Sequence, residues 1–217
     1  TLFRSDDDEQ EIEDYKSYID YELIEIEQYK NRKFKNPKLK RLANKYINVQ
    51  KNERKSIENQ DLVDSTFVRE WNKYQRKRYE LLLDINSIVG IPVQDKNSLD
   101  SILKSGKAVK EFNRVYGILV DTFDPKNFVV EEVTGVSGKE KRYIGDFENT
   151  TGHYINYIDI SIDFYDENDK VYSGFRFNTR YVWENGTKKS FEFSIPDSDT
   201  RFKYFKVNLG EKSFRFE

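Results

Sequence analysis

The spacing of hydrophobic positions changes once along the chain, near residue 124. Before that point apolar residues recur at steps of three and four, the period that places them on one face of a helix. After Asp124 and Pro125 they alternate with polar residues, as in strands that bury one face. The pattern predicts an α+β chain with two segregated domains, a helical one at 1–124 and a β one at 125–217.

Four helices are predicted in the first domain, arranged as an antiparallel bundle. The first follows the acidic run after Ser5 and ends before Pro37, with Phe34 as a candidate last position on its apolar face. The second opens with Asn36 as N-cap and Pro37 at the first helical position. Because the link between these helices is short, we expect them to be antiparallel neighbours.

The third helix is predicted to end at the 90–92 segment, and Ser98 is the expected cap of the fourth. Gly106 and Gly117 weaken the prediction that the fourth helix is continuous, since each costs about 1 kcal/mol relative to alanine. The predicted apolar positions are Ile12, Tyr15, Ile19, Leu23 and Ile26, then Leu39, Leu42, Tyr46, Val49 and Ile57, then Val63, Phe67, Trp71, Tyr74, Leu81, Leu82 and Ile85, then Leu99, Ile102, Val109, Phe112, Val115 and Tyr116.

About seven short strands are predicted in the second domain. The clearest run alternates Ile158, Ile160, Ile162 and Phe164 with polar residues, and a second run continues from Val171 to Trp183. Turn-forming residues at 167–169 and 184–186 have hairpin spacing. Shorter runs lie at 128–133, 143–147, 191–195, 202–209 and 214–216. This number of strands indicates a Greek-key sandwich and is also compatible with a small barrel.

The second domain resembles the FxLYD family over residues 128–209. An asparagine-containing turn, Glu148-Asn149-Thr150-Thr151, precedes a long alternating strand that closes in Ile162-Asp163-Phe164-Tyr165-Asp166. Tyr165 and Asp166 match the family pentapeptide, whereas Ile162 and Phe164 replace its usual phenylalanine and leucine. The segment 186–193 is similar to the family's glycine-led strand, with Asn185 in place of the usual preceding proline.

The resemblance implies an immunoglobulin-like sandwich from an exported bacterial or archaeal protein, often a membrane-anchored lipoprotein. It implies no established catalytic residues, so it bears on fold and location more than on activity. The helical domain resembles no family that we recognise.

Composition removes several kinds of chemistry. The absence of cysteine excludes disulfides, thiolate zinc sites and cysteine nucleophiles. His153 is the single histidine, and no serine lies in a nucleophile-elbow sequence to serve it. Walker, dinucleotide-binding and HExxH patterns are also missing. We therefore expect no enzyme activity, no cofactor and no metal.

The strongest charge feature is a basic run without any acidic residue between its members. It spans the predicted turn between the first two helices, and Arg69, Lys73, Arg76, Lys77 and Arg78 are a candidate extension. Such a cluster suits teichoic acid, anionic lipid headgroups or nucleic acid, or it is a solvated hairpin tip. Its members are Lys30, Arg32, Lys33, Lys35, Lys38, Lys40, Arg41 and Lys45.

Three weaker candidates have plainer structural explanations. Carboxylates at 6–14 and 166–169 supply oxygen ligands for calcium but lack the EF-hand pattern. Aromatic residues at 29, 34, 46, 71, 74 and 79 would stack on single-stranded nucleic acid, although their helical spacing favours a core. Asn149 and Asn185 head glycosylation sequons, a pattern that arises often by chance.

These observations predict a non-catalytic protein of the bacterial cell envelope, membrane-anchored at the surface or secreted, that acts as an interaction module. Its partner would be an envelope component or protein. The alternative is a binding protein for an anionic polymer through the basic run, and an enzyme of unrecognised type is the remote third hypothesis. No stretch is apolar enough to cross a bilayer, so anchoring would depend on an export signal ahead of Thr1.

Overall fold

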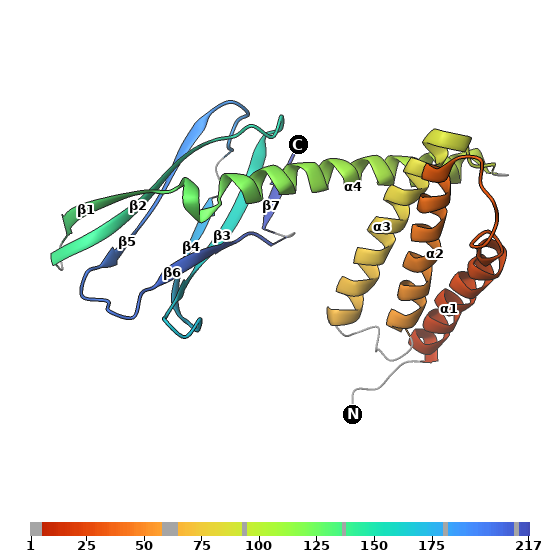
Figure 1. Cartoon of the computed structure of the whole chain (residues 1–217), viewed down its shortest axis with the longest axis horizontal. Coiled ribbons are helices and arrows are strands. Elements are labelled where there is room, and N and C mark those ends of the chain that lie inside the picture. The colour runs from red at the N-terminus through yellow and green to blue at the C-terminus, as the bar shows by residue number, and fades with distance from the viewer. Residues whose placement is uncertain (1–5, 58–64, 93–94, 136–137, 180–181, 211–212) are drawn as a thin grey trace. The chain divides into compact units, whose positions relative to one another are not determined.

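The chain forms two compact units, Thr1–Phe112 and Asn113–Glu217. The computed structural model describes residues 6–57, 65–92, 95–135, 138–179, 182–210 and 213–217, and only the backbone of 6–11, 65–68 and 179. Four helices precede seven antiparallel strands, so the predicted class of helical bundle followed by β-sandwich is confirmed (Figure 1). Val63 and Tyr181 lie outside the described residues.

The helices are α1 Asp6–Glu27, α2 Pro37–Ile57, α3 Ser65–Val89 and α4 Lys96–Thr122. Asn36 caps α2 as predicted, since its Oδ1 accepts from the backbone N–H groups of Lys38 and Leu39. The first helix ends before Pro37 as predicted, but it stops at Glu27 and leaves the candidate position Phe34 in the connection. The predicted cap of the fourth helix was wrong, since α4 is capped not by Ser98 but by Asp95, which accepts from the N–H groups of 97 and 98.

Within the helical unit α2 packs between α1 and α3 (Figure 1). Glycine at 106 permits a close approach of α4 to α3, since an added Cβ would lie 2.6 Å from the Tyr79 carbonyl oxygen and 3.0 Å from the Leu83 Cβ. At Gly117 nothing lies within 4 Å of the same position. α4 continues through both glycines, and only the first has a packing reason.

The strands form two antiparallel sheets. One has the order β1-β2-β5, and in the other β3 lies between β4 on one side and both β6 and β7 on the other. The strands are β1 Val129–Gly135, β2 Gly138–Glu148, β3 Ile155–Tyr165, β4 Val171–Thr179, β5 Lys188–Pro196, β6 Tyr204–Asn208 and β7 Phe214–Phe216. The second predicted run is divided: β4 ends at Thr179, and Trp183 forms a separate bridge to Ile155.

The space between the sheets is filled mainly by aromatic rings. Phe193 of β5 contacts Phe164 of β3 and Phe205 of β6, with ring centroids 5.7 and 5.1 Å apart. Phe191 contacts Phe177 of β4 at 5.6 Å. Contacts of this kind contribute beyond the apolar area that they bury. In β3 and β5 the alternation read from the sequence is thus the alternation of the core, whereas Val171 and Phe175 of β4 are exposed.

The last turns of α4 belong to the β unit, so this unit begins before the predicted boundary at 124. Val115, Leu119 and Phe123 are each at most 1% exposed. The Phe123 ring meets Phe147 and Phe191 edge-on, with centroids 5.1 and 5.0 Å away. The helical period predicted α4, but it did not show that the end of this helix is part of the sandwich core.

A buried asparagine holds the β2–β3 turn. The Asn149 amide donates to the carbonyl oxygens of His153 and Trp183, and its Oδ1 accepts from the backbone and hydroxyl of Thr151. Asn149 is 1% exposed and both its N–H groups have acceptors. This sequon asparagine is therefore a structural residue whose amide is not accessible in the folded state. Among the described residues, no helix has the length and apolarity needed to span a bilayer.

Candidate functional site

The eight basic residues predicted as a binding surface form the tip of the α1–α2 hairpin, here called the basic tip. Four lie in the connection 28–36 and four on the first turns of α2, and all eight are exposed. Lys38, Arg41 and Lys45 follow one another along α2 at spacings of three and four, so they share one exposed face of the helix. The positive end of the α2 dipole points to the same tip.

These charges are not neutralised by the part of the chain that the structure describes. None of the eight forms an ion pair with a described carboxylate. Arg32 donates to the Gln28 side chain and lies 4.8 Å from the centroid of the Tyr29 ring, contacts that position the guanidinium without cancelling its charge. The nearby Glu27 pairs with Lys51 instead, a contact that holds the pKa of Glu27 below its usual value.

The candidate extension of the basic tip along α3 is only partly available. Lys77 lines a groove with Lys45, but Glu80 and Asp84 line it too. Lys73 pairs with Glu70, and Arg78 points into the helical unit. The α3 residues therefore add little free positive charge to the basic tip.

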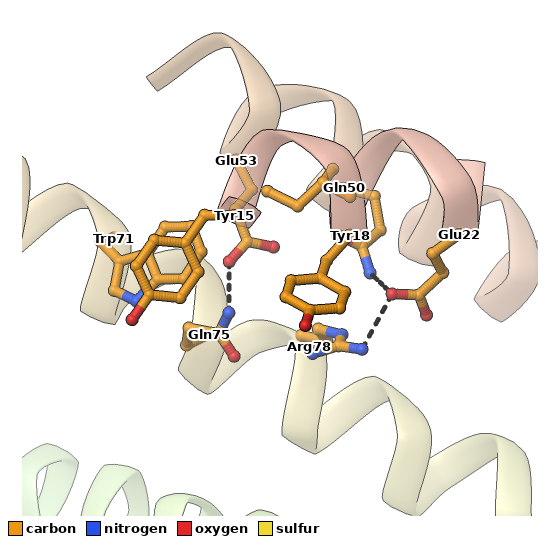
Figure 2. Close-up of a pocket in the computed structure, with 9 residues that line it drawn as sticks. Tyr15, Tyr18, Glu22, Gln50, Glu53, Trp71, Gln75 and Arg78 are labelled. Carbon is orange, nitrogen blue, oxygen red and sulfur yellow. Dashed lines mark hydrogen bonds and ion pairs between the residues drawn. The ribbon is translucent and has the colours of Figure 1, made fainter. Parts of the chain in front are cut away.

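A second site, which the sequence did not predict, lies between α1, α2 and α3. It is a cavity of about 340 Å³ whose walls carry Tyr15, Tyr18 and Trp71 beside a group of polar side chains (Figure 2). The Tyr15 and Trp71 rings are in contact, with centroids 4.9 Å apart. Tyr18 is 73% exposed, so the cavity opens to solvent on the α1 side.

In one carboxylate of this cavity, both oxygens accept hydrogen bonds. Glu22 of α1 accepts from Tyr46 through one oxygen, and its other oxygen accepts from Gln50 at 2.6 Å and from Arg78 at 2.8 Å. Burial would lower the pKa of Arg78, but the oxygens of Tyr46 and Glu22 raise it on balance. Glu22 and Arg78 thus cancel each other's charge.

In the second carboxylate, one oxygen has no hydrogen-bond donor. Glu53 of α2 is fully buried, and it accepts one hydrogen bond from Gln75, at 2.6 Å. Its Oε2 has no partner, nor has the Oε1 of Gln50, which is 1% exposed. The amide of Gln50 is oriented by Glu22, so its oxygen faces away from that carboxylate. Burial raises the pKa of Glu53 to about 7.

The sequence contained one signal of this site. The inward stripe of α2 reads Leu42, Tyr46, Gln50, Glu53 and Ile57, so polar residues occupy two positions that the helical period assigns to the core. Sequence reading chose the adjacent Val49, which is half-buried. Buried polar residues are rarely retained without partners, and here those partners come from α1 and α3.

The remaining candidates are accounted for by local structure. Asp166 accepts from the backbone of residues 168 and 170, as expected of a hairpin turn. His153 packs on Phe216, with its Nδ1 3.1 Å from the carbonyl oxygen of Glu217. Of the aromatic residues considered for stacking, Tyr46 is buried. The described residues contain no group of three or more His, Asp or Glu side chains placed to hold a metal, and side chains 6–11 lie outside them.

We compared the chain with known protein families, curated proteins and solved structures. No family model, no curated protein and no solved structure matches the chain. The FxLYD resemblance of 128–209 therefore stays a prediction.

Proposed function

We propose that this chain is a non-catalytic interaction module of the bacterial cell envelope and that its helical unit binds a phosphate-bearing polymer through the basic tip. The observation that carries the proposal is the set of eight exposed cations without an ion pair to any described carboxylate. The chain's formal net charge is −2, so this positive surface is local and does not reflect an excess of basic residues.

Wall polymers of the teichoic acid class fit this surface best. They present closely spaced phosphates on a flexible backbone, which lysine and arginine side chains on a convex tip can follow without base-specific contacts. Of the six aromatic rings considered for base stacking, Tyr29 is exposed, and Arg32 lies against its face. Tyr46 is buried, Trp71 packs against the core of the helical unit, and the other three are half-buried. The envelope location rests on the FxLYD resemblance.

The test is binding of purified teichoic acid to the full chain over a range of salt concentrations. We expect the affinity for teichoic acid to fall steeply as the salt concentration rises. Binding of the protein releases salt cations from the phosphates of the polymer, and this release becomes less favourable at high salt. The triple variant Lys33→Glu, Lys38→Glu, Arg41→Glu should lose binding. Lys96→Glu, Lys104→Glu, Lys107→Glu is the matched control, since it changes the charge equally on exposed positions of α4.

Equal binding by the two triple variants would refute the basic tip as the binding surface. Single-stranded DNA serves as the competing polymer, and preferential binding of DNA would overturn the choice of wall polymer. The location is tested separately by the gene sequence upstream of Thr1, where an export signal is expected and its absence would contradict the envelope assignment.

A further inference from the structure

The cavity between α1, α2 and α3 has two buried acceptors without a donor. Among the described side chains that line it, these buried unpartnered atoms are Gln50 Oε1 and Glu53 Oε2. They lie three residues apart on α2, on the same face of the helix. A buried acceptor without a donor is costly, so the cavity is complementary to a molecule that donates hydrogen bonds.

Charge points to the same chemistry. The residues that line the cavity include two carboxylates, Glu22 and Glu53, and one cation, Arg78, which is ion-paired with Glu22. When Glu53 is ionised, the lining therefore has one net negative charge. A ligand with a single positive charge would balance it. Figure 2 shows the Glu53 carboxylate between the Tyr15 and Tyr18 rings, with one oxygen held by Gln75.

The aromatic walls favour an organic cation over a metal ion. Tyr15, Tyr18 and Trp71 present ring surfaces, to which ammonium groups are attracted when they are withdrawn from water. A calcium ion needs six to eight oxygen ligands. Here Glu22 has both oxygens engaged, and two free oxygens are too few for such a site.

From these observations we propose that the cavity binds a small organic ammonium group, with Glu53 and Gln50 as acceptors and Tyr15, Tyr18 and Trp71 as an aromatic wall. The cavity volume of about 340 Å³ suits a compact primary ammonium group, which carries three N–H donors. Exposure of Tyr18 leaves the rest of the ligand room to extend into solvent. This site is independent of the basic tip.

Butylammonium is the first probe and 1-butanol, its neutral isostere, is the control ligand. Calorimetric titration of the full chain should detect butylammonium, whereas the neutral isostere should bind at least about tenfold more weakly. Glu53→Gln keeps the side-chain shape and removes the charge, so we expect it to weaken butylammonium binding about tenfold or more. Glu25→Gln, on the exposed face of α1, is the matched control and should leave binding unchanged.

A second pair of variants tests the wall. Trp71→Leu should lower the affinity for butylammonium, and Trp71→Phe should retain most of it, because phenylalanine preserves a ring face. Equal affinity for butylammonium and 1-butanol, or unchanged butylammonium affinity in Glu53→Gln, would overturn the proposal. So would the failure of butylammonium to bind at about 10 mM, a concentration above the dissociation constant of a weak specific site.

Discussion

The interiors of the two units contain different kinds of side chains. The β unit encloses rings from both sheets and from the end of α4, with Trp183 and Phe123 each 1% exposed. The helical unit places aliphatic side chains at Ile12, Ile19 and Ile57 beside a hydrogen-bonded network centred on Glu22 and Arg78, with a cavity next to it. One interior is closed and apolar, and the other is partly polar and open.

This difference separates stability from binding. Rings that interlock between sheets stabilise the unit and leave little room for a ligand. A buried carboxylate with a free oxygen stabilises nothing by itself and is costly when ionised. We therefore expect the β unit to act as the rigid part of the chain and the helical unit to carry both candidate binding surfaces. The predictions below test this contrast.

The largest effect is expected where α4 enters the aromatic core. Phe123→Ala should destabilise the β unit by about 3–5 kcal/mol, because it opens a cavity among fully buried rings. Unfolding in urea, followed by the fluorescence of Trp183 in a Trp71→Phe background, measures it. Phe175→Ala is the control, and its cost should be clearly smaller because Phe175 is 46% exposed. Equal costs would contradict a core that depends on α4.

The buried Glu53 should make the helical unit less stable as pH rises. Its pKa is about 7 in the folded protein against an ordinary value of 4.5, so protonation favours the folded state. The stabilisation is full below pH 4.5 and is lost as pH rises through 7, a change of about 3 kcal/mol at most.

Glu53→Gln isolates this contribution from other titrating groups. The variant should match the natural protein near pH 4.5 and exceed its stability at pH 8, as measured by urea unfolding with circular dichroism at 222 nm. A natural protein that is as stable as the variant at pH 8 would show that Glu53 is ionised without cost.

Removing the partner of Glu22 should also weaken the helical unit. Arg78→Met keeps much of the side-chain length but leaves Glu22 half-buried and without its cation, which we expect to cost about 2–3 kcal/mol. The comparison is Arg69→Met, since the Arg69 side chain is 72% exposed and its Nε lies 4.0 Å from a carboxylate oxygen of Glu70. A surface change of that kind should stay within about 0.5 kcal/mol, and similar losses in both variants would argue against the polar network.

The smallest effects are expected at the two glycines of α4, and they should have opposite signs. Gly117→Ala should stabilise by about 0.5–1 kcal/mol, since alanine is the better helix former and space is open there. Gly106→Ala should destabilise by about 1–2 kcal/mol, because its Cβ would meet the Tyr79 carbonyl oxygen. Thermal unfolding of the two variants gives both signs, and stabilisation at both positions would disprove close packing of α4 on α3.

The sequence predicted those parts of the fold that follow from the spacing of apolar residues. Four helices and seven strands follow from spacing, and the α2 start follows from Asn36 and Pro37. The errors lie at ends. Ser98 and Asp95 are both good N-caps, and only the backbone geometry selects Asp95. The run from 171 to 183 lies beside β3 at both of its described parts, since Thr179 pairs with Ile158 and Trp183 pairs with Ile155.

The candidate sites show the same division. The basic tip was visible in sequence because its members are close along the chain, and charge needs no partner to be recognised. The cavity between α1, α2 and α3 was not visible in sequence. Glu22, Glu53 and Arg78 come from three different helices, and only the tertiary structure brings them together. Glu53 is the single acidic residue of α2, and its neighbours along the chain do not show that it is buried or which side chains surround it.

By itself, then, the sequence determined which residues are helical, which are strands and where positive charge gathers, because these properties depend on neighbours within a few positions. Tertiary structure decided that the last turns of α4 enter the sandwich core and that two polar positions of α2 border a cavity. The physical reason is that burial and pairing are set by side chains distant in sequence, so a carboxylate acquires its shifted pKa and its free oxygen only when other helices close around it.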